Sequence, residues 1–105
     1  MMPIPLKEPL ACESMDEIRQ AIDALDLEVI TLWARRFEYV KAAAKFKTDE
    51  LSVRAPERFE AMLTQRGQWA QDQGLNPAVI ADLYRNLVTY FIQEELEHWR
   101  QPPVS

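Results

Sequence analysis

The sequence predicts an all-α protein with three helices, the first of which is very long. Apolar residues recur at steps of three or four along most of the chain, which is the spacing of one face of an α-helix. No segment has the alternation of apolar and polar residues that is typical of a β-strand. No glycine or proline occurs between Ser14 and Pro56. These observations favour a single all-helical domain.

The first helix is expected to begin at Ser14 and to run to about Lys47. Ser14 followed by Glu17 matches a capping box. Its apolar stripe consists of Ile18, Ile22, Leu25, Val29, Leu32, Val40 and Ala43. A helix of about 34 residues is roughly 50 Å long, whereas a compact domain of about 100 residues has a radius of gyration near 13 Å. The stripe must therefore be covered by something else, and a second copy packed antiparallel about a twofold axis is the simplest partner.

Helix-boundary residues place the other two helices. Pro56 suits the first turn of the second helix. The pair Gly74-Leu75 fits a Schellman-type helix end, and Asn76-Pro77 provides an N-cap and a first-turn proline for the third helix. Pro102-Pro103 prevents its continuation. The segment 48–55, between the first and second helices, is expected to be a loop.

The domain organisation follows from these boundaries. Residues 1–13 are rich in proline and aperiodic, so we expect a flexible N-terminal arm. Residues 14–100 are expected to form the helical domain, and residues 101–105 a C-terminal tail. With 105 residues, of which 48% are apolar, the chain is large enough for one small domain with a core and too small for two.

Composition argues against several classes of function. The net charge is -5, whereas a general nucleic-acid binder would have a basic excess. An anionic ligand would therefore have to be attracted by locally placed cations. Cys12 is the only cysteine, so neither a disulfide nor a zinc cluster is expected, which fits a reducing cytosol. No stretch has transmembrane length, and we expect a cytoplasmic protein that binds neither membranes nor nucleic acid.

Arg36 and Lys47 interrupt the apolar stripe of the first helix. A cation on a buried face is costly unless something anionic meets it. The two residues are about three turns apart, so on a straight helix they project on nearly the same side at a distance of about 16 Å along the axis. Both side chains are long enough to converge on a small carboxylate between them. In an antiparallel dimer centred near residue 30, Arg19 of one chain would lie opposite this window of the other.

Glu95 is the corresponding interruption in the third helix, on a face that also carries apolar and aromatic side chains. They are Tyr84, Val88, Phe91 and Trp99. A carboxyl group facing a cation-lined pocket can pair with the cations, or it can donate a hydrogen bond if it is protonated. The structural alternatives are that Arg36 and Lys47 extend to solvent or pair with a carboxylate, and that Glu95 is simply their partner. The tryptophans are interpreted as packing or rim residues. No nucleophile set, metal-ligand spacing or glycine-rich phosphate loop is visible, so no metal and no cofactor is expected.

Several runs of residues are informative beyond their periodicity. They are Ile18-Arg19-Gln20-Ala21-Ile22-Asp23, Ala34-Arg35-Arg36-Phe37-Glu38-Tyr39-Val40-Lys41 and Lys45-Phe46-Lys47. These runs resemble the small all-helical chorismate mutase family, the type II fold. Three more runs resemble its isochorismate pyruvate lyase branch, namely Ala55-Pro56-Glu57-Arg58, Gln68-Trp69-Ala70 and Glu97-His98-Trp99-Arg100. The resemblance covers about residues 14–100 and includes the charged interruptions.

The resemblance implies an intertwined homodimer that binds a small dianionic substrate, isochorismate or chorismate. By this likeness, Arg19 is donated across the interface and binds one substrate carboxylate, while Arg36 binds the other. Lys47 approaches the ether oxygen, and Glu95 falls where the lyase has a glutamine that donates to the ether region. The four residues are therefore candidates for substrate binding, and Lys47 and Glu95 also for catalysis. The family's reactions are pericyclic, so the resemblance also implies no cofactor.

The implied activity is that of an isochorismate pyruvate lyase with weak chorismate mutase activity, which forms salicylate, commonly for siderophore synthesis. Mutases usually place a carboxylate after the arginine that begins the second helix, whereas here Phe59 follows Arg58. This favours the lyase over the alternative, a chorismate mutase that makes prephenate. Ionised Glu95 cannot donate a hydrogen bond, which supports a third alternative, a non-catalytic helical dimer that binds a metabolite or a partner protein. Burial would raise the pKa of Glu95 and Lys47 would lower it, so both protonation states stay open.

Overall fold

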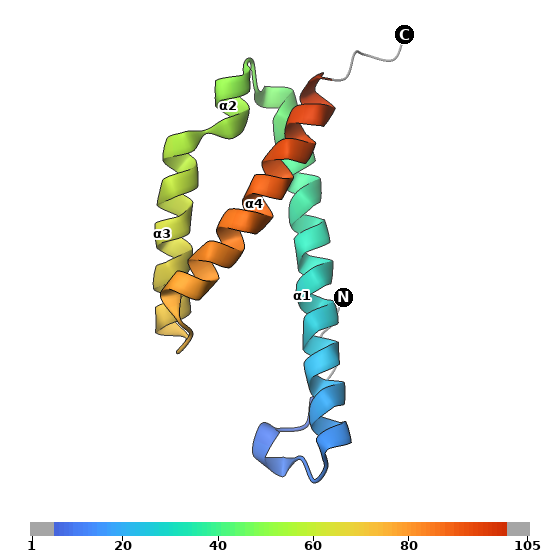
Figure 1. Ribbon diagram of the computed structural model, residues 1–105. Coiled ribbons are helices and arrows are strands. Elements are labelled where there is room, and N and C mark those ends of the chain that lie inside the picture. Colours follow the sequence, from blue (N-terminus) through green and yellow to red (C-terminus); the bar gives the residue numbers. More distant parts are fainter. Residues whose placement is uncertain (1–5, 101–105) are drawn as a thin grey trace. The chain divides into compact units, whose positions relative to one another are not determined.

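The computed structural model of the protein describes residues 6–100. The elements in chain order are the 3-10 turn η1 (Pro9–Ala11), α1 (Met15–Ala43), the 3-10 turn η2 (Ala44–Phe46), α2 (Glu50–Arg54), α3 (Pro56–Asp72) and α4 (Pro77–Arg100) (Figure 1). No strand occurs in this part of the chain, which confirms the all-helical prediction. The chain divides into two compact units, of which residues 6–38 and 39–100 are described, and each is considered by itself.

The first unit begins with a short arm that is attached to the start of α1. The helix begins at Met15, directly after the predicted cap Ser14, whose Oγ accepts a hydrogen bond from the N–H of Glu17 at 3.2 Å. The carboxylate of Glu17 in turn accepts a bond from the N–H of Glu13 at 2.9 Å and pairs with Lys7 at 3.1 Å. The predicted start of the first helix is therefore confirmed.

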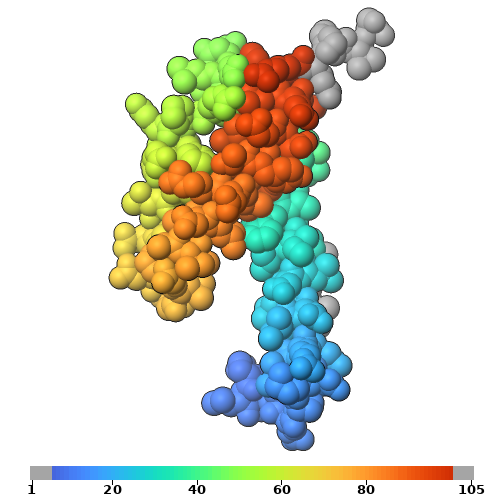
Figure 2. All heavy atoms as spheres, in the orientation of Figure 1, coloured from blue at the N-terminus to red at the C-terminus, as the bar shows by residue number. Residues whose placement is uncertain are grey.

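The apolar stripe of α1 is largely exposed. No residue between 6 and 38 is buried, and in Figure 2 the blue to cyan segment contains the N-terminal arm at its blue end and α1. The exposed fractions along the stripe are 50% for Ile22, 47% for Leu25, 40% for Val29 and 57% for Leu32. Because apolar area in water is unfavourable by about 25 cal/mol per Å², this face of α1 would be stabilised by a covering surface.

The first helix is shorter than predicted. It ends at Ala43, after 29 residues, and the chain tightens into η2, as is common at helix ends. The N–H of Lys47 donates to the carbonyl of Ala44 at 3.1 Å, and Lys47 itself has an extended backbone with φ -93° and ψ 136°. Lys47 therefore lies outside the helix, and the expectation that one straight helix carries both Arg36 and Lys47 on one side is wrong.

The segment 48–55 is also different from the prediction, because it contains the short helix α2. Asp49 caps this helix: its Oδ1 accepts hydrogen bonds from the N–H of Ser52 at 2.7 Å and from the hydroxyl of the same residue at 2.6 Å. Ala55 ends the helix in the left-handed region, at φ 40°, and its N–H donates to the carbonyl of Leu51 at 2.8 Å. A helix of five residues is too short to reveal itself by apolar periodicity.

The core of the second unit lies between α3 and α4, which run side by side in opposite directions (Figure 1). Its central residues are Met62, Leu63 and Val88, with Phe59, Tyr84 and Ile92 packed against them. Every one of these side chains belongs to a face with helical spacing, so the core follows directly from the amphipathic pattern of the two helices.

The boundaries of α3 and α4 agree with the predicted signals. After α3, the N–H of Leu75 donates to the carbonyl of Ala70 at 2.8 Å, and Gly74 has φ 79°, which is the Schellman geometry. The side chain of Asn76 then accepts a bond from the N–H of Ala78 at 2.9 Å and so caps α4. Pro102-Pro103 lies outside the described residues. Between residues 6 and 100, no helix is sufficiently long and apolar to cross a membrane.

Candidate functional site

Two of the predicted site residues, Lys47 and Glu95, meet in the second unit. The Nζ of Lys47 lies 3.9 Å from Oε1 of Glu95, and their side chains are 25% and 5% exposed. This distance is too long for a direct hydrogen bond, so the contact is an ionic one in a poorly solvated place. A cation and a carboxyl group from distant parts of the sequence are thus adjacent.

The ammonium group of Lys47 is held by the main chain of α2. Its Nζ donates to the carbonyl of Ser52 at 3.0 Å. In a continuing helix this carbonyl would accept from the N–H four residues later, but that residue is Pro56, which has no N–H. The proline at the start of α3 therefore leaves an acceptor at which Lys47 can bind.

The main chain of Lys47 is held by α4. The indole Nε1 of Trp99 donates to the carbonyl of Lys47 at 3.1 Å. Trp99 is four residues after Glu95, so both side chains lie on one face of α4. One helix face therefore contacts both the side chain and the backbone of Lys47.

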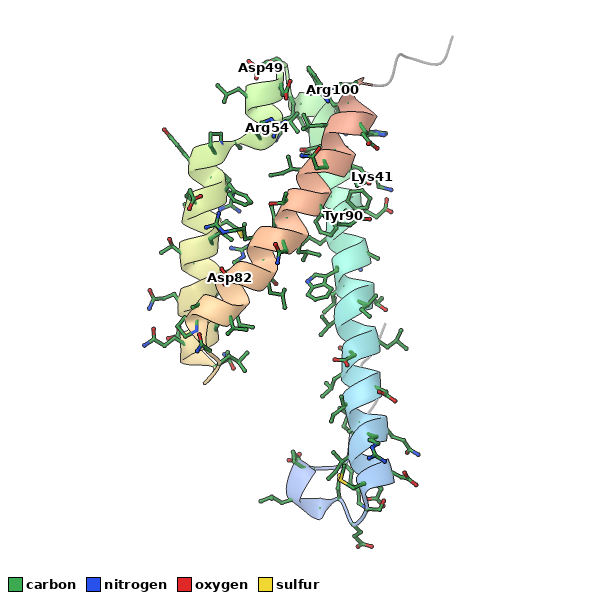
Figure 3. All side chains as sticks on the ribbon, in the orientation of Figure 1. Lys41, Asp49, Arg54, Asp82, Tyr90 and Arg100 are labelled. Carbon is green, nitrogen blue, oxygen red and sulfur yellow. The ribbon has the colours of Figure 1, made fainter. Side chains whose placement is uncertain are left out.

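A second set of charges joins α2 to the end of α4. The carboxylate of Glu50 pairs with Arg54 at 3.0 Å and with Arg100 at 2.9 Å. Figure 3 labels Arg54 on α2 and Arg100 at the end of α4, in the same region of the second unit. The pKa of Glu50 is lowered, first by Arg100 and then by Arg54. These pairs are exposed to solvent, so we expect salt to weaken them.

The protonation of Glu95 is decided by two opposing effects. Burial raises the pKa of its carboxyl group, and the positive charge of Lys47 lowers it by a smaller amount. The net direction is upward, so the neutral form persists to higher pH than for an ordinary glutamate. A neutral carboxyl group can donate a hydrogen bond, and the site therefore contains two potential donors to an anionic ligand.

The two predicted arginines belong to the first unit. Arg19 is exposed, with 67% of its side chain accessible, and its guanidinium lies 4.0 Å from the carboxylate of Asp16 on the same helix. Arg36 is half-buried, and its Nη1 is shielded from solvent. Of the four predicted residues, only Lys47 and Glu95 are brought together within one unit.

Two contributions to this site were not predicted from the sequence. The first is the carbonyl of Ser52, whose role depends on the unexpected helix α2. The sequence did contain an indication, because Pro56, four residues later, has no N–H to bind this carbonyl. Trp99 was interpreted as a packing or rim residue, although its spacing from Glu95 placed it on the same face. Between residues 6 and 100, no group of three or more histidine, cysteine, aspartate or glutamate side chains is arranged to hold a metal ion.

Comparison with known proteins adds independent information. Residues 18–96 match the family described as chorismate mutase type II, a span that includes all four predicted site residues. The chain is 40% identical to the isochorismate pyruvate lyase of Pseudomonas aeruginosa over 96 residues, which cover 91% of this chain and 95% of that protein. It is also 38% identical to the T-protein of Haemophilus influenzae over 77 residues, which cover 72% of this chain and 20% of that protein.

Proposed function

The chain belongs to the chorismate mutase type II family, and we propose that it is an isochorismate pyruvate lyase that converts isochorismate to salicylate and pyruvate. The observation that carries this proposal is the similarity to the Pseudomonas aeruginosa lyase, which extends over 95% of that protein at 40% identity. The T-protein match covers only 20% of its length, so the name of that relative says less about this chain.

The proposed substrate carries two carboxylates, which need cations in fixed places. We assign Arg36 to one carboxylate and Arg19 of the partner subunit to the other, with Lys47 and Glu95 at the ether oxygen. The contact between Lys47 and Glu95 at 3.9 Å supports their assignment to one place. The ammonium group has three donors, of which the carbonyl of Ser52 takes one, so Lys47 can remain anchored while it donates to a ligand.

The chemistry proposed for this site requires no cofactor. In the cleavage of isochorismate, the ether C–O bond breaks and a ring hydrogen moves to the enolpyruvyl methylene, so that salicylate and pyruvate together contain all the atoms of the substrate. The protein holds the reacting atoms in a compact conformer and stabilises the negative charge that develops on the departing ether oxygen. Lys47 in a poorly solvated site is suited to the second task, because low dielectric strengthens its field.

We propose that Glu95 acts in its protonated form and donates a hydrogen bond to the ether region. The upward pKa shift caused by burial supports this role. The ionised form could only accept hydrogen bonds and would repel the anionic substrate. Activity should therefore fall as the pH rises through the pKa of Glu95.

The active unit is proposed to be an intertwined homodimer in the cytoplasm, with two equivalent sites. The exposed stripe of α1 supports it, because Leu25, Val29 and Leu32 are each at least 40% exposed in the single chain. In an antiparallel arrangement about residue 30, the stripes of two copies cover one another, and Arg19 of the partner subunit reaches the site of the first copy.

The second candidate function is that of a chorismate mutase that forms prephenate, as the family name indicates. The residue after Arg58 argues for the lyase as the main activity. That residue is Phe59, which packs against the core of α3 and α4 and lies below the guanidinium of Arg85, whose Cζ is 5.7 Å from the ring centroid. An apolar, packed side chain cannot hold the hydroxyl group of chorismate, so only weak mutase activity is expected.

The test is to incubate the purified protein with isochorismate and, separately, with chorismate across a range of pH. Salicylate is followed by fluorescence and prephenate by its conversion to phenylpyruvate in acid. Salicylate formation that Lys47→Ala abolishes supports the proposal. Prephenate alone would establish the mutase, and the absence of both products at every pH would leave a non-catalytic metabolite or protein binder.

A further inference from the structure

We infer that Trp99 is a positioning residue for Lys47, and that its indole N–H fixes the backbone from which the catalytic ammonium group projects. This inference rests on the proposed function, because it gives Trp99 a role in the same site. It is carried by one contact, the 3.1 Å hydrogen bond from Trp99 Nε1 to the carbonyl of Lys47. Trp99 is not assigned any contact with substrate.

Lys47 needs such a restraint because of its place in the chain. It follows the last residue of η2 and has an extended backbone, so the regular hydrogen bonds of a helix do not hold it on both sides. Its N–H donates to Ala44 at 3.1 Å, within the same turn. Its carbonyl is held by Trp99, which is 52 residues away in the sequence. The tryptophan therefore links this backbone directly to α4.

The same helix face also carries Glu95, and this makes the restraint relevant to catalysis. One turn of helix separates Glu95 from Trp99, a rise of about 5.4 to 6 Å. The first residue lies beside the ammonium group of Lys47, and the second binds its carbonyl. The spacing of α4 thus sets the distance between the two proposed donors to the ether oxygen.

The last turn of α4, which carries Trp99, also contacts α2. Arg100, the next residue, pairs with Glu50 of α2 at 2.9 Å, and Ser52 of α2 accepts the bond from Nζ of Lys47. The backbone and the side chain of Lys47 are therefore attached to two elements that are attached to each other. Because a misplacement of about 1 Å can reduce a rate by about 100-fold, this closed set of contacts has kinetic consequences.

The decisive variant is Trp99→Phe, which retains an aromatic ring and removes the N–H donor. We expect kcat for salicylate formation to fall by about tenfold while KM changes by less than about threefold, because the loss concerns the developing charge more than the binding of the carboxylates. Trp69→Phe is the matched control, since Trp69 is 52% exposed and belongs to α3. Wild-type kcat in Trp99→Phe would overturn the inference.

A loss of folded protein could also lower kcat, so a second measurement is needed that does not depend on activity. The carboxyl group of Glu95 is titrated by NMR in the wild type and in both variants. Lys47 lowers the pKa of this group, so an ammonium group that moves away in Trp99→Phe will let the pKa rise. A simple loss of stability would leave the titration of the folded protein unchanged, and an unchanged pKa would contradict the inference.

A third measurement uses the wild-type protein alone and remains valid if Trp99→Phe does not fold. The indole N–H of Trp99 should exchange with solvent more slowly than that of Trp69, because it is hydrogen-bonded. Equal exchange rates would overturn the inference. If the wild type forms neither salicylate nor prephenate, the proposed function fails by itself, and the titration and the exchange rates still decide whether Trp99 holds Lys47.

Discussion

The two units of the chain hold their site residues in opposite ways. In the second unit, Lys47 is bonded through its N–H, its carbonyl and its Nζ, and Glu95 lies against it with 5% of its side chain exposed. In the first unit, Arg19 is 67% exposed and its guanidinium approaches only Asp16, at 4.0 Å, among the ion pairs of the described residues. Lys47 and Glu95 are held by contacts within the second unit, whereas most of the Arg19 side chain is accessible to solvent.

The apolar side chains of the two units differ in the same way. Those of α3 and α4 pack on one another and form a buried core, whereas those of α1 between residues 15 and 38 are all at least partly exposed. Hydrophobic side chains at helical spacing that stay exposed are typical of an interface. The contrast shows that Lys47 and Glu95 are brought together by packing within the second unit, and it agrees with the proposal that Arg19 acts in a partner subunit.

The largest effect is expected from Lys47→Ala. This change removes the proposed donor to the ether oxygen, and the loss of one such preplaced group lowers kcat by about 100-fold to 1,000-fold. Lys45→Ala is the control, because Lys45 is exposed in the same turn and lies over the ring of Phe46. Steady-state salicylate formation measures both variants. Equal activities of the two variants would show that Lys47 contributes no more to the reaction than the exposed Lys45.

The next prediction tests the proposal that Arg19 is contributed by the partner subunit. Arg19→Ala and Lys47→Ala should each be inactive alone, but a mixed dimer would contain one site with both residues intact. Equal mixing gives heterodimers as half of the dimers, with one active site in two, so about a quarter of wild-type activity should return. Differently tagged subunits are used to demonstrate exchange. Activity that stays absent in proven heterodimers would place Arg19 outside the partner's site.

Local signals explain why the helix ends could be predicted. Ser14, Gly74 and Asn76 each act on backbone groups within a few residues, so their effect is visible in the sequence alone. The end of α1 at Ala43 and the helix α2 could not be predicted in this way. Both η2, which follows the end of α1, and α2 contact α4, and such contacts between distant parts of the sequence are not visible in local signals.

The charged residues of the candidate site could be proposed from the sequence, whereas the main-chain hydrogen bonds that hold Lys47 could not. Lys47 and Glu95 were selected as candidates because a charge on an apolar helix face requires an explanation. The contribution of Ser52 is a main-chain carbonyl, and that of Trp99 is a bond to a main-chain carbonyl. The backbone of every residue carries such groups, so residue type does not distinguish them. These two contacts can be recognised only from the structure, in which α2 and α4 approach Lys47.

Glu95→Gln should change the pH dependence of both activity and stability. The folded-state pKa of Glu95 is raised above its ordinary value of 4.5 by burial, so the folded state binds the proton more tightly than the unfolded state. The stability from this proton is complete below 4.5 and is lost as the pH rises through the folded-state pKa. A glutamine carries no such proton, so the variant should unfold at a higher temperature than the wild type at about pH 8 and at a similar temperature at about pH 4.

The same substitution should flatten the fall of salicylate formation at high pH, because a glutamine donates a hydrogen bond at every pH. Glu94→Gln is the control on the adjacent position of α4, where the side chain is not buried. A variant at Glu95 whose activity falls with pH as in the wild type would show that another group controls the profile.

The smallest effects are expected at the two residues between 39 and 100 that have a left-handed backbone. Ala55 has φ 40°, a conformation that costs a residue with Cβ about 1–2 kcal/mol, so Ala55→Gly should stabilise the protein by up to about 1 kcal/mol after the added flexibility of the unfolded chain is included. Gly74 has φ 79° and open space around the position of a Cβ, so Gly74→Ala should destabilise it by about 1 kcal/mol through the backbone alone. The unfolding temperature should shift by about 4–8 °C per kcal/mol, upward for Ala55→Gly and downward for Gly74→Ala.

Both shifts should keep their sign at every protein concentration, because these residues act within the fold. A charged substitution on the α1 stripe should instead act through association, so its effect on the unfolding temperature should depend on protein concentration.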